Sequence, residues 1–240
     1  MNLRSTLRRP LTWLIAVPLL VLVLAVGGPF VYIHFIKADP AERLAFADAQ
    51  TTTTAGTDTT VATSGTDESI EGTWSVGDGS EAGYRVREIL LGQDTTATGR
   101  TSDVTGDLVI TGTTIDAAEF TVDLTTVESG EDRRDNQFHG RIMDTGTYPT
   151  AAFALTEPIV LDVVPADLEE ITVSATGEFT IHGVTKPVAF ELKARRNGGA
   201  IEVNGTIPVV FSDYEIPDAS GGPATVADNG EIEFLLILAA

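Results

Sequence analysis

The feature that most constrains this chain is an alternation of apolar and polar residues with a period of two, which recurs along its C-terminal two thirds. In ITVSATGEFTI (residues 171–181), Val173, Ala175, Phe179 and Ile181 fall on one face, and threonines, a serine and a glutamate fall on the other. A period of two places successive side chains on opposite sides of a β-strand. The pattern therefore predicts an all-β domain whose strands each have one apolar face.

Short turns containing Gly, Asn or Pro separate the alternating runs, which predicts an antiparallel meander. About eight such strands can remove their exposed edges by closing into a barrel. Only residues 129–140 (SGEDRRDNQFHG) break the period, and they predict one short polar helix capped by Ser129. The chain has no cysteine, so a packed interior rather than disulfides must stabilise the barrel.

A barrel of eight strands is near the size at which the interior is filled by its own side chains or holds one ligand. Small inward residues such as Gly177, Ala175, Ala194 and Gly205 would leave room along an elongated cavity, or would lie where a solid barrel tapers. Composition leaves both alternatives open. The residues predicted to line the interior, and to contact any ligand there, are Tyr84, Val86, Phe120, Val122, Leu124, Phe153, Leu155, Phe179, Ile181, Val188, Phe190, Leu192, Val209, Phe211, Phe234 and Leu236.

Residues 11–36 contain no Lys, Arg, Asp or Glu and are long enough to cross a hydrocarbon core of ~30 Å as a helix. Arg4, Arg8 and Arg9 precede them, which predicts a cytoplasmic N-terminus (residues 1–10) and a single-pass protein of the cell membrane with its barrel on the extracytoplasmic side. A cleaved signal peptide is the alternative, but its apolar region is normally much shorter.

Residues 37–69 are rich in threonine and poor in large apolar side chains, so they predict a disordered linker to a barrel domain at residues 70–240. The formal net charge of the whole chain is −20, and every basic residue before position 38 flanks the apolar run. The rest of the chain, from residue 38 onward, is strongly acidic, which argues against a nucleic-acid partner because phosphate backbones would repel it.

Two stretches resemble signature segments of the YceI family: ATGEFTIHGVTKPVAFEL (residues 175–192) and DRRDNQFHGRIMDTGTYPTAAF (residues 132–153). The likeness extends from about Trp74 to the last strand. It implies a lipocalin-like barrel in a periplasmic or secreted setting that holds an isoprenoid-type amphiphile, and it adds no enzymatic mechanism. No cofactor is predicted. One departure is Gln137, which stands where many relatives have histidine.

Arg134 and Arg141 are the candidate contacts for the head group of such a ligand at the barrel mouth. The alternative is that the arginines of residues 132–135 pair with neighbouring carboxylates on a solvated face, where ion pairs contribute little.

His182 and Gly183 lie between two alternating runs and predict a hairpin turn, with His182 on the polar, outward register. Catalysis by His182 would need a second base or a metal, and the spacing contains no nucleophile, base and orienting group, so no enzyme is expected. Asp213, Glu215 and Asp218 do not match a calcium loop, and no metal site is predicted.

The leading hypothesis is a membrane-anchored, extracytoplasmic module that holds an isoprenoid or similar lipid chain inside its barrel. A lipid tail that moves from the bilayer into an apolar tunnel avoids the cost of exposure to water, ~0.8 kcal/mol per methylene. The alternative is a structural or interaction protein of the cell envelope with a solid barrel core and no ligand.

Overall fold

The computed structural model describes residues 18, 28, 40–47 and 69–240 of the chain. The predicted cytoplasmic segment and, apart from Pro18 and Gly28, the predicted transmembrane helix lie outside the described residues, as does most of the predicted linker. Within the described residues, no helix has the length and apolar character needed to cross a bilayer.

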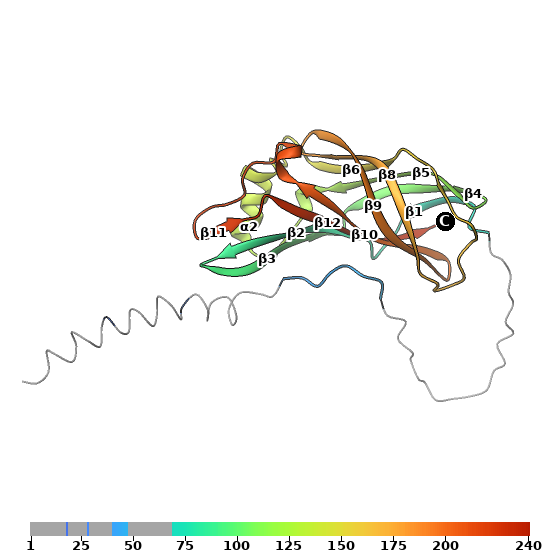
Figure 1. The fold of residues 1–240 in the computed structure, drawn as a ribbon, viewed down its shortest axis with the longest axis horizontal. Coiled ribbons are helices and arrows are strands. Elements are labelled where there is room, and N and C mark those ends of the chain that lie inside the picture. The colour runs from blue at the N-terminus through green and yellow to red at the C-terminus, as the bar shows by residue number, and fades with distance from the viewer. Residues whose placement is uncertain (1–17, 19–27, 29–39, 48–68) are drawn as a thin grey trace, which may run out of the picture.

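The described strands form one antiparallel sheet that closes on itself (Figure 1). The closed ring runs β1, β4, β5, β6, β8, β9, β10 and β12, and β12 returns to β1 through Ser75 opposite Ala239 and Val76 opposite Leu238. The predicted eight-stranded antiparallel barrel is confirmed. The strands are β1 (Gly72–Val76), β2 (Glu81–Leu90), β3 (Gln93–Thr101), β4 (Val104–Thr111), β5 (Thr114–Asp123), β6 (Thr150–Leu155), β7 (Ile159–Val160), β8 (Ile171–Ile181), β9 (Val184–Asn197), β10 (Ala200–Val210), β11 (Ala224–Val226) and β12 (Asn229–Ala239).

The hairpin of β2 and β3 extends the barrel at one end. There β12 pairs with β2 instead of β1, and β3 reaches the segment after β5 through a backbone bridge between Arg100 and Glu128. β3 is not among the predicted strands, because QDTTATGRT (residues 93–101) has no alternating apolar side chains. The hairpin nevertheless forms one wall of the barrel at this end (Figure 1).

The predicted short helix is confirmed as α2 (Asp132–Gln137), and a π-helical turn, η3 (Phe138–Ile142), continues it. Its predicted cap differs, because Glu131 occupies the N-cap position and the hydroxyl of Ser129 donates to Asp135 instead. Two 3-10 turns, η2 (Leu124–Thr126) and η4 (Phe211–Tyr214), follow β5 and β10. The helix lies at the same end of the barrel as the β2–β3 hairpin (Figure 1).

His182 and Gly183 form the predicted turn between β8 and β9, and both have positive φ, 53° and 74°. Two consecutive residues of positive φ are the requirement of a type I′ hairpin. The side chain of His182 is half-buried: its ring centroid lies 4.6 Å from that of Tyr148, and its Nδ1 is 3.2 Å from the Tyr214 carbonyl oxygen. Its role in the described structure is to close this turn.

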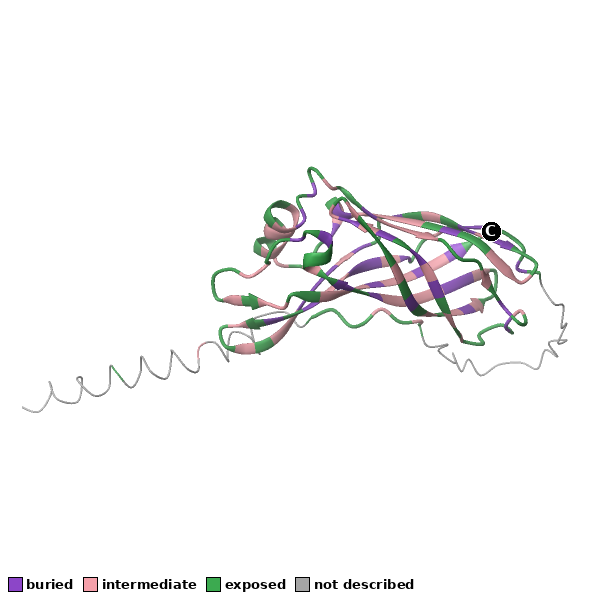
Figure 2. Cartoon of the chain, turned by 45° about the horizontal axis from the view of Figure 1, so that its top comes forward, coloured by how far each residue is buried: buried purple, intermediate pink, exposed green. Residues whose placement is uncertain are grey.

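The apolar faces of the strands meet inside the barrel, where the buried residues gather (Figure 2). They form two clusters. One surrounds Phe179, Val209 and Met143 near the helix, and the other surrounds Trp74 and Leu238 at the opposite end. All of the predicted lining residues are buried or half-buried.

Residues 40–47, which we call the strap, lie against the outer surface of the barrel (Figure 1). The Ala41 amide donates to Thr98 Oγ1 at 3.1 Å, and Asn204 Nδ2 donates to the Leu44 carbonyl at 2.7 Å. This differs from the predicted linker, whose disorder was inferred chiefly from the threonine-rich residues 51–66. The strap (PAERLAFA) has a different composition, with a charged and an aromatic side chain that find partners on the sheet.

Candidate functional site

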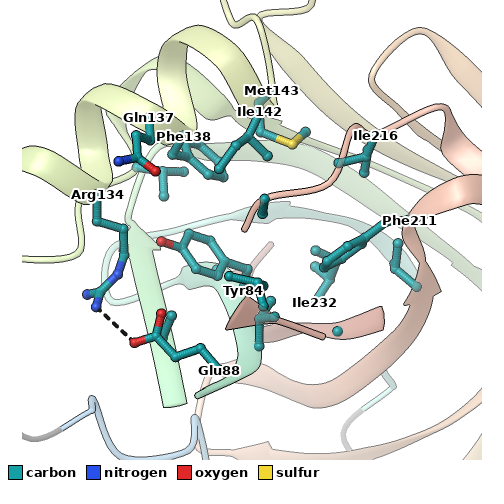
Figure 3. A pocket seen from close by; sticks show the side chains of 18 of the residues that line it. Tyr84, Glu88, Arg134, Gln137, Phe138, Ile142, Met143, Phe211, Ile216 and Ile232 are labelled. Carbon is teal, nitrogen blue, oxygen red and sulfur yellow. Dashed lines mark hydrogen bonds and ion pairs between the residues drawn. The ribbon is translucent and has the colours of Figure 1, made fainter. Parts of the chain in front are cut away.

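A cavity of about 480 Å³, the main chamber, lies inside the barrel between the β2–β3 hairpin and the helical segment α2–η3 (Figure 3). Eight of the predicted lining residues contribute to its wall: Tyr84, Val86, Val122, Leu124, Phe179, Ile181, Val209 and Phe211. They reach it from β2, β5, β8, β10 and the turns η2 and η4. The chamber therefore draws on residues that lie far apart in the sequence.

The helical segment supplies wall residues that the sequence analysis missed, namely Phe138, Ile142 and Met143 (Figure 3). The Phe138 ring stacks on the Tyr84 ring, with centroids 5.1 Å apart and an interplanar angle of 14°. A signal was present in the sequence, because Phe138 and Ile142 have the i, i+4 spacing of one helical face. The charged residues 132–135 before them indicate a solvated helix instead.

Four other predicted lining residues surround a second, much smaller space of about 80 Å³ near the opposite end of the barrel: Phe120, Phe153, Leu155 and Leu192. The remaining four, Val188, Phe190, Phe234 and Leu236, line neither space and pack within the core clusters. The interior is thus not one elongated hollow. One half is a chamber and the other half is packed, so each alternative drawn from composition describes half of the barrel.

Three phenylalanines, Phe153, Phe190 and Phe234, form a chain of rings between the two spaces, which we call the aromatic partition. The ring centroids of Phe153 and Phe190 are 5.4 Å apart, and those of Phe190 and Phe234 are 6.0 Å apart, both edge to face. The partition occupies the space that was expected beside Gly177 and Gly205. A Cβ at Gly177 would lie 2.6 Å from the Phe153 ring, and a Cβ at Gly205 would lie 2.6 Å from the Phe234 ring.

The main chamber reaches the surface where charged residues of α2 meet the tip of the β2–β3 hairpin, and we call this opening the mouth. Leu91 is 41% exposed there, and Arg134 Nη2 lies 3.4 Å from Glu88 Oε1 (Figure 3). Arg134 therefore lines the chamber at its mouth, where it is paired with the Glu88 carboxylate. Within the chamber, burial raises the pKa of the Tyr84 phenol to about 12.

Arg141, the second candidate for a head-group contact, is engaged elsewhere. Its guanidinium donates to the carbonyl oxygens of Asp218 at 2.6 Å and Ala219 at 3.1 Å, and so holds the loop after η4 against the helical segment. It is not among the residues that line the main chamber. The structure brings together Arg134 and the apolar wall, but not Arg141.

The family model for the YceI-like domain matches residues 74–238. A polyisoprenoid binding domain from Saccharophagus degradans implicated in plant cell wall breakdown is 18% identical, with a TM-score of 0.56 over 70% of this chain and 98% of that one.

BcnA from Burkholderia cenocepacia is 20% identical, with a TM-score of 0.50 over 64% of this chain and 95% of that one. The search of curated proteins found no match. At these identities the solved structures establish a shared fold, and the family model covers most of the chain. The chain therefore belongs to the YceI family.

Proposed function

We propose that the barrel binds the apolar chain of an isoprenoid or a similar amphiphile in the main chamber. The observation that carries this proposal is an internal space of about 480 Å³ whose wall is almost wholly apolar and which opens at a charged mouth. Spaces of roughly 300–1,000 Å³ are typical of small-ligand sites. An apolar tail transferred from water gains ~0.8 kcal/mol per methylene buried.

The chemistry of the wall favours binding over catalysis. The titratable groups that line the chamber are the Tyr84 phenol, Glu231 and the charged side chains of the mouth, and they include no hydroxyl or thiol nucleophile beside a histidine. The Saccharophagus degradans neighbour is described as a polyisoprenoid binding domain, which supports the same ligand class here. The alternative, a ligand-free structural or interaction protein, is favoured only by the packed half of the barrel.

Native mass spectrometry of the detergent-solubilised full chain tests this proposal. We expect a co-purifying lipid on the wild type and its loss in Ala151→Phe, because Ala151 is a buried wall residue and a benzyl group there would occupy the chamber. Ala189→Phe, on the exposed face of β9, is the matched control and should retain the lipid. A clean apo mass for the wild type, together with no binding of added farnesol, would contradict the proposal.

We further propose that residues 11–36 anchor the protein in the cell membrane and that the barrel lies on the extracytoplasmic side. The strap supports a close tether, because only residues 37–39 separate the predicted helix from it. Ile89 and Leu91, 46% and 41% exposed at the tip of the β2–β3 hairpin, present apolar side chains to a lipid surface beside the mouth. A tail could then exchange with little exposure to water.

The location can be tested with single cysteines, since the chain contains none. In intact cells, a membrane-impermeant maleimide should label Ala189→Cys, and it should label Asn2→Cys only after lysis. Equal protection of both cysteines in intact cells would place the barrel in the cytoplasm. Release of the labelled barrel into a soluble fraction would indicate a cleaved N-terminus.

A further inference from the structure

We infer that the aromatic partition limits the length of the chain that this protein accepts, so that its ligand is an amphiphile with a short apolar tail. The tail would end against the partition instead of threading the whole barrel. This inference rests on the proposed function and adds a ligand class to it. The observations that carry it are the two separate spaces and the three phenylalanines between them.

The order of residues along the strands places the partition between the two spaces. On β8, Phe179 lines the main chamber and Ala175 lines the small one, with Gly177 between them. On β10, Val209 lines the main chamber and Val203 the small one, again with a glycine between them. The partition thus crosses the interior at the level of these two glycines.

The strand pairings hold the rings at that level. Phe153 pairs with Phe179 and reaches over Gly177, and Phe234 pairs directly with Gly205. A side chain at Gly177 or Gly205 would collide with the ring on the neighbouring strand, so glycine at these two positions leaves the space that the rings occupy. Phe190, only 9% exposed, contacts both other rings edge to face and closes the gap between them.

The volumes on the two sides give the consequence for a ligand. The main chamber holds about 480 Å³, whereas the space beyond the partition holds about 80 Å³. While a tail still fits the main chamber, each further methylene raises the affinity about fourfold. Once the tail reaches the partition, additional isoprene units must remain at the mouth or in water. The affinity should then stop rising with chain length.

The test is to measure the affinity of the full chain in detergent for linear prenols from farnesol through geranylgeraniol to solanesol. For the wild type, we expect the affinity to stop rising before solanesol. In Phe190→Ala the two spaces should join, so solanesol should bind at least about tenfold more tightly than it binds the wild type. Leu108→Ala is the matched control: it enlarges the small space, lies opposite Trp74 and Ala118 and not opposite a ring of the partition, and should leave the wild-type length limit unchanged.

Circular dichroism would verify the fold of each variant, and Phe190→Leu, which removes less volume, would replace Phe190→Ala if that variant does not fold. Affinity that keeps rising to solanesol in the wild type would overturn the length limit and leave the proposed function standing. A length limit that is the same in the wild type and in a folded Phe190 variant would show that the partition does not set it. Failure of the wild type to bind any prenol would reject the proposed function itself.

Discussion

At the scale of single residues, Glu233 shows how the outer surface of the barrel is held together. Its side chain is 2% exposed. Its neighbours in the sequence, Ile232 and Phe234, face the interior, so Glu233 faces the outside of the barrel. Arg85 Nε lies 2.5 Å and Arg43 Nη1 2.9 Å from its carboxylate, and Arg100 also donates to it. A buried carboxylate is tolerated only when it is paired in this way. Arg43 belongs to the strap, so the strap completes the cluster.

The first prediction is that Glu233→Ala lowers the free energy of unfolding by about 3 kcal/mol, because it leaves poorly exposed arginines without their carboxylate. Urea denaturation of the two proteins measures this difference. Glu231→Ala is the control: its side chain is 42% exposed and pairs with Arg43 in solvent, and its loss should cost less than about 1 kcal/mol. Equal effects of the two substitutions would contradict this account of the cluster.

The second prediction concerns pH. Burial raises the pKa of Tyr84 from 10 to about 12. Below pH 10 the phenol is neutral in both the folded and the unfolded chain, and between pH 10 and 12 only the unfolded chain ionises. The folded state should therefore lose up to about 2.7 kcal/mol of stability across that interval. Unfolding measured against pH should show a smaller decline in Tyr84→Phe, and superimposable profiles would refute the assignment.

At the scale of elements, the strap illustrates how side chains of the sheet can order a segment that has no sheet partner of its own. Backbone carbonyls of the strap accept hydrogen bonds from side chains on β2, β9 and β10, including Arg85, Arg195 and Asn204. Arg195 also lies 4.5 Å from the centroid of the Phe46 ring. These contacts fix a segment that precedes the barrel in the sequence along its outer surface.

The third prediction is that Asn204→Ala accelerates hydrogen exchange of the Ala41 amide of the strap, which donates to Thr98 Oγ1, about fivefold, because opening of the strap then breaks one hydrogen bond fewer, worth ~1 kcal/mol. Exchange measured by mass spectrometry on the full chain would report it. Thr180→Ala removes an exposed bond to Thr185 and should not alter the strap. Unchanged strap exchange in Asn204→Ala would mean that the other contacts suffice to hold it.

At the scale of the whole molecule, the barrel has two unlike halves on either side of the aromatic partition. The half with the main chamber is covered by α2–η3 and the β2–β3 hairpin, whereas the other half is packed around Trp74, Leu108 and Leu238. A cavity removes packing contacts from its wall, so local opening should be easier in the chamber half.

The fourth prediction follows from this difference. Farnesol should slow the hydrogen exchange of amides in β2, β3 and α2 more than that of amides in β1 and β4, because it restores packing contacts only in the chamber half. The packed half serves as the internal control within one experiment. Protection confined to β1 and β4 would place the ligand in the wrong half of the barrel.

The sequence by itself determined the inward faces of those strands whose apolar and polar residues alternate; β3 is not one of them. The period of two in residues 171–181 decides which side chains of β8 enter the interior, and the His182-Gly183 pair decides the turn that joins β8 to β9. Both are local properties, because side-chain direction and turn type depend on neighbouring residues only. The eight-stranded barrel and its helix followed from the same patterns, supported by the family resemblance.

Only the tertiary structure decided how the interior is divided and what lies on the outside. Phe153, Phe190 and Phe234 meet because the pairing register of their strands brings them to one level, and the alternation pattern does not specify that register. The strap binds because residues distant in sequence, such as Asn204, reach its backbone. A small inward residue can leave space or can be covered by an aromatic ring, depending on which side chains lie next to it inside the barrel. Only the folded chain brings those side chains together.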